Sequence, residues 1–275
     1  MRTRRVPAVL TVVVLGVAGC AGPRTGSLGP APTASRAAIP AASPSPTATI
    51  TIQLWYTRAG RIVPTRRTRP ATLATSRLSL TELAAGPAPA EAAAGLTTAF
   101  PAGTAFDIVG ITDGVATVSF TAGFYAGGRD AARLRQAQVA YTLTQFPTVS
   151  TVAFQSDREA RGGPVGRGAF ADLLPAIVVT APLIGERVAS PVTVTGTADV
   201  FEGTVSARIL DAAGREISTA FTTATCGSGC RGDYRLTLPY RLPADQAGVV
   251  EVYEVSPADG SRVNVVDIPV SLAGG

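Results

Sequence analysis

From residue 177 onward, the sequence consists of short runs in which apolar and polar residues alternate, separated by turn residues such as Pro182 and Gly214. Because successive side chains of a strand point to opposite faces, alternation with a period of two indicates strands rather than helices. About seven short strands in about 100 residues are typical of an immunoglobulin-like fold. We therefore predict an all-β immunoglobulin-like sandwich over residues 175–272. The expected strands are 177–179, 192–195, 205–210, 217–223, 234–238, 249–255 and 263–270.

Residues 48–157 combine strands with helices. Asp113 and Gly114, a dipeptide that tolerates positive φ, separate two alternating runs and predict a β-hairpin. Two longer segments with helical spacing predict helices that pack on one small mixed sheet, which gives a small two-layer α/β domain. The chain as a whole is thus predicted to be α+β. The expected strands are 50–56, 61–65, 106–111, 115–120 and 149–154, and the expected helical segments are 75–85, 90–96 and 129–145.

The N-terminus has the layout of an export signal. Arg2, Arg4 and Arg5 precede an apolar run at 6–18, which is too short to span a bilayer as a stable helix. The run ends in Val-Ala-Gly-Cys, which resembles the lipobox of bacterial lipoproteins. We predict that residues 1–19 are a signal peptide and that Cys20 is lipidated, with an ordinary secretory signal as the alternative. The expected location is the outer face of the cell membrane, held there by the lipid on Cys20.

Two segments have compositions that are typical of connections. Residues 20–47, beginning with the lipidated cysteine, are rich in Ala, Pro, Ser and Thr, and they cannot bury enough apolar surface to offset their ordering entropy. We expect a disordered tether there. Residues 158–174 are rich in glycine and arginine and are predicted to be a linker between the two domains.

The charge of the processed chain is small. All 24 basic residues are arginine, and removal of the three in the signal peptide leaves 21 against 19 acidic residues, or about +2. A charge this small gives no reason to expect nucleic acid as a partner.

Cys226 and Cys230 are the only cysteines besides Cys20, and they enclose a glycine-rich pentapeptide. A zinc site would need about four ligands, and the chain contains no histidine. Outside the cytoplasm a disulfide is the expected state of such a pair, with two free thiols as the alternative.

The missing residue types exclude most covalent catalysis. Without histidine there is no Ser-His-Asp or Cys-His arrangement, and without lysine there is no Ser-Lys dyad or Schiff base. A glycine-rich phosphate loop with its lysine is absent too, so we expect no cofactor and no metal. Carboxylate pairs remain, as in glycoside hydrolases: Asp199 with Glu202, and Asp157 with Glu159. Solvated loops are the alternative interpretation of both pairs.

Two groups of residues are candidates for binding. Arg66 and Arg67, with Arg69 nearby, form a small basic cluster that is able to meet anionic cell-wall polymer or lipid, unless it is a solvated loop. Phe201 and Glu202 could mark a binding edge, and the alternative is a buried aromatic residue beside a turn carboxylate. The tripeptide beginning at Arg231 reads as an adhesion motif, although chance explains it in a chain so rich in Arg and Gly.

The folded part of the sequence resembles a known pair of domains. The first is similar to the GerMN domain, named from sporulation and spore-germination proteins, and the second is similar to the immunoglobulin-like Gmad2 domain. In one departure, Asp157-Arg158 stands where we expect Asp-Gly after the last strand of the first domain. The resemblance implies envelope assembly or scaffold-forming contacts rather than a defined reaction. The matching stretches are 83–87, 100–104, 113–120 and 138–147 in the first domain, and 174–182, 190–198 and 200–205 in the second.

We therefore expect a non-enzymatic cell-envelope lipoprotein that acts through contacts with envelope proteins, with cell-wall polymer or with copies of itself. The alternatives are a peptidoglycan-binding accessory of a wall hydrolase, which would use Arg66 and Arg67, and a carboxylate-only glycan hydrolase.

Overall fold

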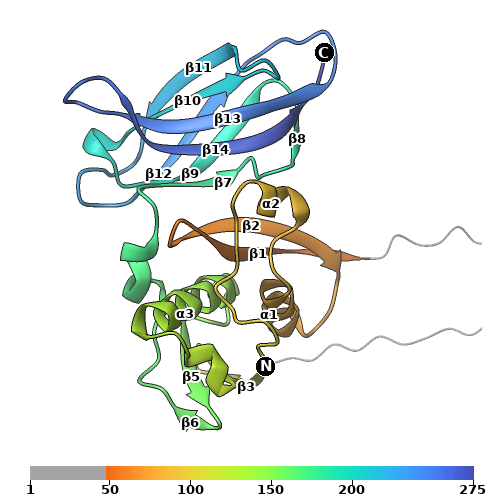
Figure 1. The fold of residues 1–275 in the computed structure, drawn as a ribbon, viewed down its shortest axis with the longest axis vertical. Helices are drawn as coiled ribbons and strands as arrows, with labels where there is room; N and C mark the ends of the chain where they lie inside the picture. Colours follow the sequence, from red (N-terminus) through yellow and green to blue (C-terminus); the bar gives the residue numbers. More distant parts are fainter. Residues whose placement is uncertain (1–47) are drawn as a thin grey trace, which may run out of the picture. The chain divides into compact units, whose positions relative to one another are not determined.

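The computed structural model describes residues 48–275, which contain a mixed N-terminal domain and a β-rich C-terminal domain (Figure 1). This arrangement confirms the predicted α+β fold class. The predicted signal peptide, the lipidated Cys20 and the tether lie outside the described residues. Within the described part, no helix is both long enough and apolar enough to cross a membrane.

Most elements of the N-terminal domain lie close to their predicted positions. Asp113 and Gly114 have φ values of 50° and 79°, so they form the two-residue hairpin turn that the sequence indicates. In chain order the elements are β1 (Thr49–Arg58), β2 (Arg61–Pro70), α1 (Thr75–Ala85), α2 (Pro89–Ala93), β3 (Phe106–Thr112), β4 (Val115–Phe120), the 3-10 turn η1 (Ala122–Tyr125), α3 (Arg129–Leu143), β5 (Thr151–Ser156), β6 (Glu159–Ala160) and the 3-10 segment η2 (Arg167–Leu173).

The N-terminal domain contains two sheets instead of the single mixed sheet that we predicted. Strands β1 and β2 form an antiparallel ribbon, and β3-β4-β5-β6 form a separate sheet in which β4 and β5 run parallel. Helix α3 contacts both β1 and β5 and lies between the ribbon and β5 (Figure 1). The prediction was wrong because alternation identifies a strand without identifying its neighbours.

Helix α3 takes the place of a neighbouring strand along β1. The side chain of Gln145 accepts a hydrogen bond from the backbone N–H of Gln53 at 2.7 Å and donates to its carbonyl at 2.7 Å. One and two turns earlier, Thr142 accepts from the N–H of Trp55 and Gln138 donates to the Trp55 carbonyl. This polar stripe satisfies backbone groups of β1 that would otherwise be buried without partners.

The core of the N-terminal domain is built around aromatic residues. Phe120 from β4 and Phe124 from η1 stack with ring centroids 3.8 Å apart, and Phe154 from β5 stacks on both. Phe100 meets Phe124 edge-on. Such ring pairs add packing energy beyond the area that they bury.

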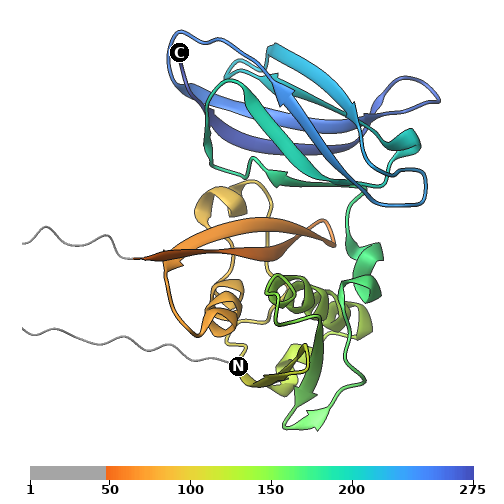
Figure 2. The same cartoon turned by 180° about the vertical axis from the view of Figure 1, so that it is seen from behind.

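The C-terminal domain is a two-layer β-sandwich, which Figure 2 shows from behind. Its sheets are ordered β11-β10-β13-β14-β8 and β12-β9-β7. All seven predicted strands are present, and β8 is an additional two-residue strand. The elements are β7 (Ile177–Ala181), β8 (Arg187–Val188), β9 (Val192–Ala198), the 3-10 turn η3 (Phe201–Gly203), β10 (Thr204–Leu210), β11 (Glu216–Thr223), β12 (Gly232–Leu238), β13 (Gln246–Val255) and β14 (Arg262–Leu272).

Residues 158–174, predicted as a linker, are packed on the N-terminal domain. Strand β6 pairs with β5, and Val165 forms a bridge with Val152 through two backbone hydrogen bonds of 2.9 Å. Phe170 is buried in the core of the domain, and Arg167 donates to the carbonyl of Tyr141 at 3.0 Å. The glycine-rich composition therefore did not indicate that the few large residues of this segment pack on the N-terminal domain.

The turn between β5 and β6 forms without the glycine that the resemblance led us to expect. Asp157 and Arg158 have φ values of 51° and 69°, the left-handed conformation that glycine adopts at lower cost. Aspartate tolerates this conformation better than most residues.

The two domains contact each other directly. Residues 48–275 belong to one compact unit, and Val178 of β7 is buried in the N-terminal core. Partly buried Ile184 packs against the cores of both domains.

Candidate functional site

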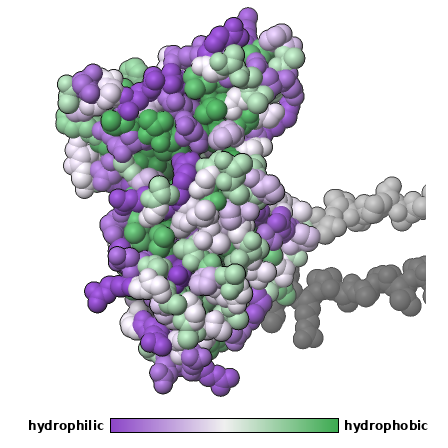
Figure 3. Space-filling view, in the orientation of Figure 1, coloured by the Kyte–Doolittle hydropathy of each residue, from purple (hydrophilic) through white to green (hydrophobic). Residues whose placement is uncertain are grey.

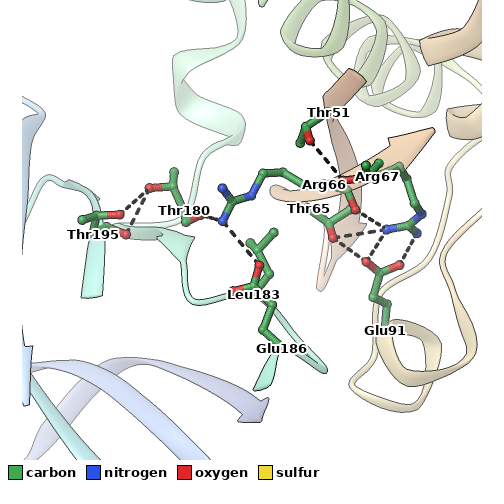
Figure 4. A network of polar contacts seen from close by, with 10 residues as sticks. Thr51, Thr65, Arg66, Arg67, Glu91, Thr180, Leu183, Glu186 and Thr195 are labelled. Atoms are coloured by element: carbon green, nitrogen blue, oxygen red, sulfur yellow. Dashed lines mark hydrogen bonds and ion pairs between the residues drawn. The ribbon is translucent and has the colours of Figure 1, made fainter. Parts of the chain in front are cut away.

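Arg67, one of the predicted binding residues, is engaged in a nearly buried ion pair with Glu91 (Figure 4). Arg67 Nη1 donates to Glu91 Oε1 at 2.7 Å, Nη2 donates to Oε2, and the two side chains are only 13% and 4% exposed. Glu91 also accepts from the hydroxyl of Thr65 and from the N–H of Ala88 at 2.7 Å. The guanidinium carbon of Arg67 lies 5.8 Å from the ring centroid of Tyr56.

Burial alone would raise the pKa of the Glu91 carboxyl. The hydrogen bonds from Arg67, Thr65 and Ala88 outweigh burial and hold the pKa of Glu91 below its ordinary value. The carboxylate is therefore charged, and both of its oxygens accept hydrogen bonds. Through this ion pair, Arg67 holds α2 against β2.

The neighbouring arginines also have carboxylate partners. Arg69 pairs with Glu82 at 2.7 Å, and Arg66 lies 3.5 Å from Glu186. Arg66 also donates to the carbonyl of Thr180 at 3.3 Å, so it reaches from β2 to the C-terminal domain (Figure 4). The alternative of a solvated loop is wrong, because these arginines lie on strand β2. Arg66 and Arg67 make internal contacts that compensate their charges locally, and their role in binding stays a prediction.

Phe201, which belongs to the second predicted binding group, is 50% exposed, so the alternative of a buried aromatic residue is wrong. It lies in η3, where Glu202 is exposed and has a φ of 53°, an unfavourable value for a residue with a side chain. The N–H of Phe201 donates to Glu254 Oε1 at 2.8 Å, and the other oxygen of Glu254 accepts from Asn264 at 2.7 Å. The backbone that presents Phe201 is thus fixed by a nearly buried carboxylate.

The expected disulfide joins Cys226 to Cys230, and the loop that it closes supports η3 from the other side. The N–H of Ser228 donates to the carbonyl of Val200 at 2.9 Å, and the hydroxyl of Ser228 accepts from the N–H of Glu202 at 2.9 Å. The disulfide loop lies so close to η3 that a Cβ at Gly227 would collide with the backbone of Gly203. A disulfide-closed loop therefore holds the Phe201 turn in position.

Removing this disulfide should loosen the Phe201 turn. For a loop this short, the entropy of the unfolded chain gives a loss of about 2 kcal/mol in the free energy of unfolding of the Cys226→Ser, Cys230→Ser variant. Denaturant titration measures this loss, and amide exchange at residues 199–203 should become faster. Unchanged exchange there would show that the turn is held without the disulfide.

The carboxylates of the two predicted pairs lie on or beside turns at the surface. Asp199 accepts a hydrogen bond from the N–H of Gly229 at 2.9 Å, which supports the disulfide loop, and Glu202 is exposed. Asp157 and Glu159 are exposed on the β5–β6 turn. Among residues 48–275 there is also no cluster of three or more potential metal-binding side chains.

The adhesion-like tripeptide has a structural role. Arg231 donates to the carbonyl of Pro175 at 2.7 Å and to those of Ala176 and Thr197 at 3.3 Å. Its guanidinium group thus ties the entry of the C-terminal domain to β9. An arginine held in this way is not available to a receptor.

Exposed apolar side chains gather at one end of the five-stranded sheet. Phe221 of β11 lies opposite Ser206 of β10, which lies opposite Tyr253 of β13. Five of the eight large hydrophobic side chains that are exposed in the described part of the chain belong to this end. Figure 3 shows apolar residues, coloured green, on the visible face of the C-terminal domain. We call this set the apolar end; it consists of Phe201, Phe221, Val255, Val263 and Val265.

Of the five residues of the apolar end, Phe201 alone was predicted from the sequence. The signal was weak: Phe221 is an isolated aromatic residue among threonine and serine, and only the strand register places it beside Tyr253. The partner of Arg67 was missed because Glu91 lies 24 residues away.

A mixed domain followed by an immunoglobulin-like sandwich, joined by a packed segment, defines a two-domain module. Residues 47–161 match the family described as sporulation and spore germination (Germane), and residues 176–261 match the immunoglobulin-like domain of bacterial spore germination (Gmad2). The chain is a tandem of a Germane domain and a Gmad2 domain, which confirms the resemblance seen in the sequence. Neither family description names an enzymatic activity.

Solved structures of low sequence identity were also found. The first GerMN domain of the sporulation protein GerM from Bacillus subtilis is 21% identical, with 43% of this chain and 95% of that chain covered and a TM-score of 0.37. The tandem GerMN domains of the same protein are 16% identical, with 82% and 61% covered and a TM-score of 0.38. A comparison with curated proteins found no match.

Proposed function

We propose that this chain is a non-enzymatic lipoprotein, anchored through Cys20 to the outer face of the cell membrane, that acts as a protein-binding scaffold. The observation that carries the proposal is the apolar end, where Phe201 and Phe221 are 50% and 75% exposed. A group of exposed apolar side chains on a soluble domain is typical of a protein interaction site, and aromatic residues are enriched at such interfaces.

The rigid presentation of Phe201 supports the same function. Its turn is held by Glu254 on one side and by the disulfide loop on the other, so little conformational entropy would be lost on binding. The pairing of Arg66 and Arg67 with carboxylates gives the wall-polymer alternative less support than the apolar end gives the scaffold.

The test is site-specific photo-crosslinking in intact cells. A photoreactive residue replaces Phe201 in one strain and Leu73 in another, because Leu73 is an exposed apolar residue away from the apolar end. We expect envelope proteins attached at position 201 and not at position 73, identified by mass spectrometry. Equal products at both positions would contradict the proposal, and muropeptides attached without protein would favour the wall-binding alternative.

The proposed anchoring is tested separately. Replacement of Cys20 by alanine should release the protein from the membrane fraction while leaving the folded domains intact, because lipid attachment is the proposed link to the membrane. Retention in the membrane fraction after carbonate extraction would contradict lipid anchoring.

A further inference from the structure

Strand β11 is an edge strand without the usual protection against pairing. Among residues 48–275 it pairs with β10 alone, and no backbone hydrogen bond joins its other edge to a described strand. Residues 217–223 contain neither a charged residue nor a proline, the devices that commonly keep sheet edges apart. By contrast β12, one of the two edge strands of the other sheet, carries exposed Asp233 and Arg235. The backbone edge of β11 is therefore suited to accept a further strand.

A row of side chains that is apolar except for Ser206, which we call the apolar row, starts at this edge and crosses the outer face of the sheet. Phe221 is 75% exposed, and the register runs from it through Ser206 to Tyr253. Val265 of β14 is exposed beyond Tyr253, next to the bulge at which the β13–β14 register shifts. A strand added to β11 would place its own side chains beside Phe221, so main-chain pairing and apolar burial would coincide.

The charged residues beside the apolar row compensate one another. Arg208 pairs with Glu251 at 2.7 Å and with Glu216 at 3.3 Å, and Arg262 pairs with Glu251 at 3.3 Å. Two arginines thus face two glutamates. In a two-fold interface each surface meets its own copy, so a patch of one sign would repel itself, whereas this balanced surface would not.

We propose that β11 pairs antiparallel with β11 of a second copy, so that two five-stranded sheets become one continuous sheet and the two Phe221 side chains lie on its outer face. This inference rests on the proposed scaffold function and names one of its partners. A second copy fits better than a charged polymer because the added strand must be neutral along residues 217–223 and tolerate an apolar neighbour. Both conditions are met by β11 itself.

The experiment is sedimentation velocity of the full chain carrying Cys20→Ser, so that no lipid contributes to association. We expect a concentration-dependent dimer whose dissociation constant rises at least about tenfold in Phe221→Glu, because a charge would lie in the apolar contact. The matched control is Leu73→Glu, which introduces the same charge at another exposed apolar position and should leave the dimer unchanged. Phe221→Ser, which adds no charge, should weaken it less.

Amide exchange locates the interface. Residues 217–223 should exchange more slowly as the concentration rises, while β12 should not change. A monomer at all concentrations, a dimer that is insensitive to Phe221→Glu, or protection elsewhere would overturn the inference. If the chain is monomeric but still captures envelope proteins at position 201, self-pairing is overturned and the scaffold function is not. If β11 forms a dimer and no envelope protein is captured, self-pairing is supported and the scaffold binds only copies of itself.

Discussion

Replacing Arg67 with alanine is expected to lower the free energy of unfolding by about 3–5 kcal/mol, because the nearly buried carboxylate of Glu91 would lose its charged partner. Thr65 and Ala88 would still donate to this carboxylate, but neutral donors do not compensate its charge. Urea titration followed by circular dichroism measures the change.

The adjacent Arg66 provides the matched control. Arg66→Ala removes the same side chain from the same strand, but this arginine is 41% exposed and lies 3.5 Å from a carboxylate that is equally exposed. We expect a loss below about 1 kcal/mol, as for other surface ion pairs. Similar losses in the two variants would mean that the Arg67 pair is no more important than a surface contact.

Replacing Gln138 with leucine should also destabilise the N-terminal domain, by about 2–4 kcal/mol. The fully buried amide of Gln138 accepts from the N–H of Ala99 at 2.9 Å and donates to the carbonyl of Trp55 at 2.8 Å. Leucine has a similar size but cannot make either bond, so two backbone groups would lose their partner. Differential scanning calorimetry of the variant should show a lower unfolding temperature.

Gln136 on the same helix distinguishes lost hydrogen bonds from a general effect of leucine on α3. This residue is only partly buried, and Gln136→Leu should change the unfolding temperature little. If both variants behaved alike, the amide stripe along β1 would not be the source of the stability.

The positions of the strands and helices were easier to predict from periodicity than the neighbours of each strand. The alternation at 249–255 and 263–270 identified β13 and β14, because both strands have one buried face. The separate β1–β2 ribbon was not predictable, since its neighbour is a row of side chains on α3. The spacing of apolar residues along the sequence does not indicate which backbone groups of β1 these side chains bind.

The candidate site was predicted in part. Phe201 was found from its position next to Glu202, but whether an isolated aromatic residue is buried depends on tertiary contacts that the sequence does not show. The carboxylate partners of Arg67 and Arg69 were not predicted for a related reason: three nearby arginines indicate a basic surface, and only the fold brings Glu91 and Glu82 to them.

The packed segment before the C-terminal domain has a consequence for the order in which the chain folds as it is made. Phe170 and Val178 are part of the core that begins with β1, and Val178 already belongs to the first strand of the next domain. A domain generally folds once its whole sequence is present. The N-terminal core therefore lacks Val178 until synthesis has reached the first strand of the second domain, so the first domain is completed only as the second begins.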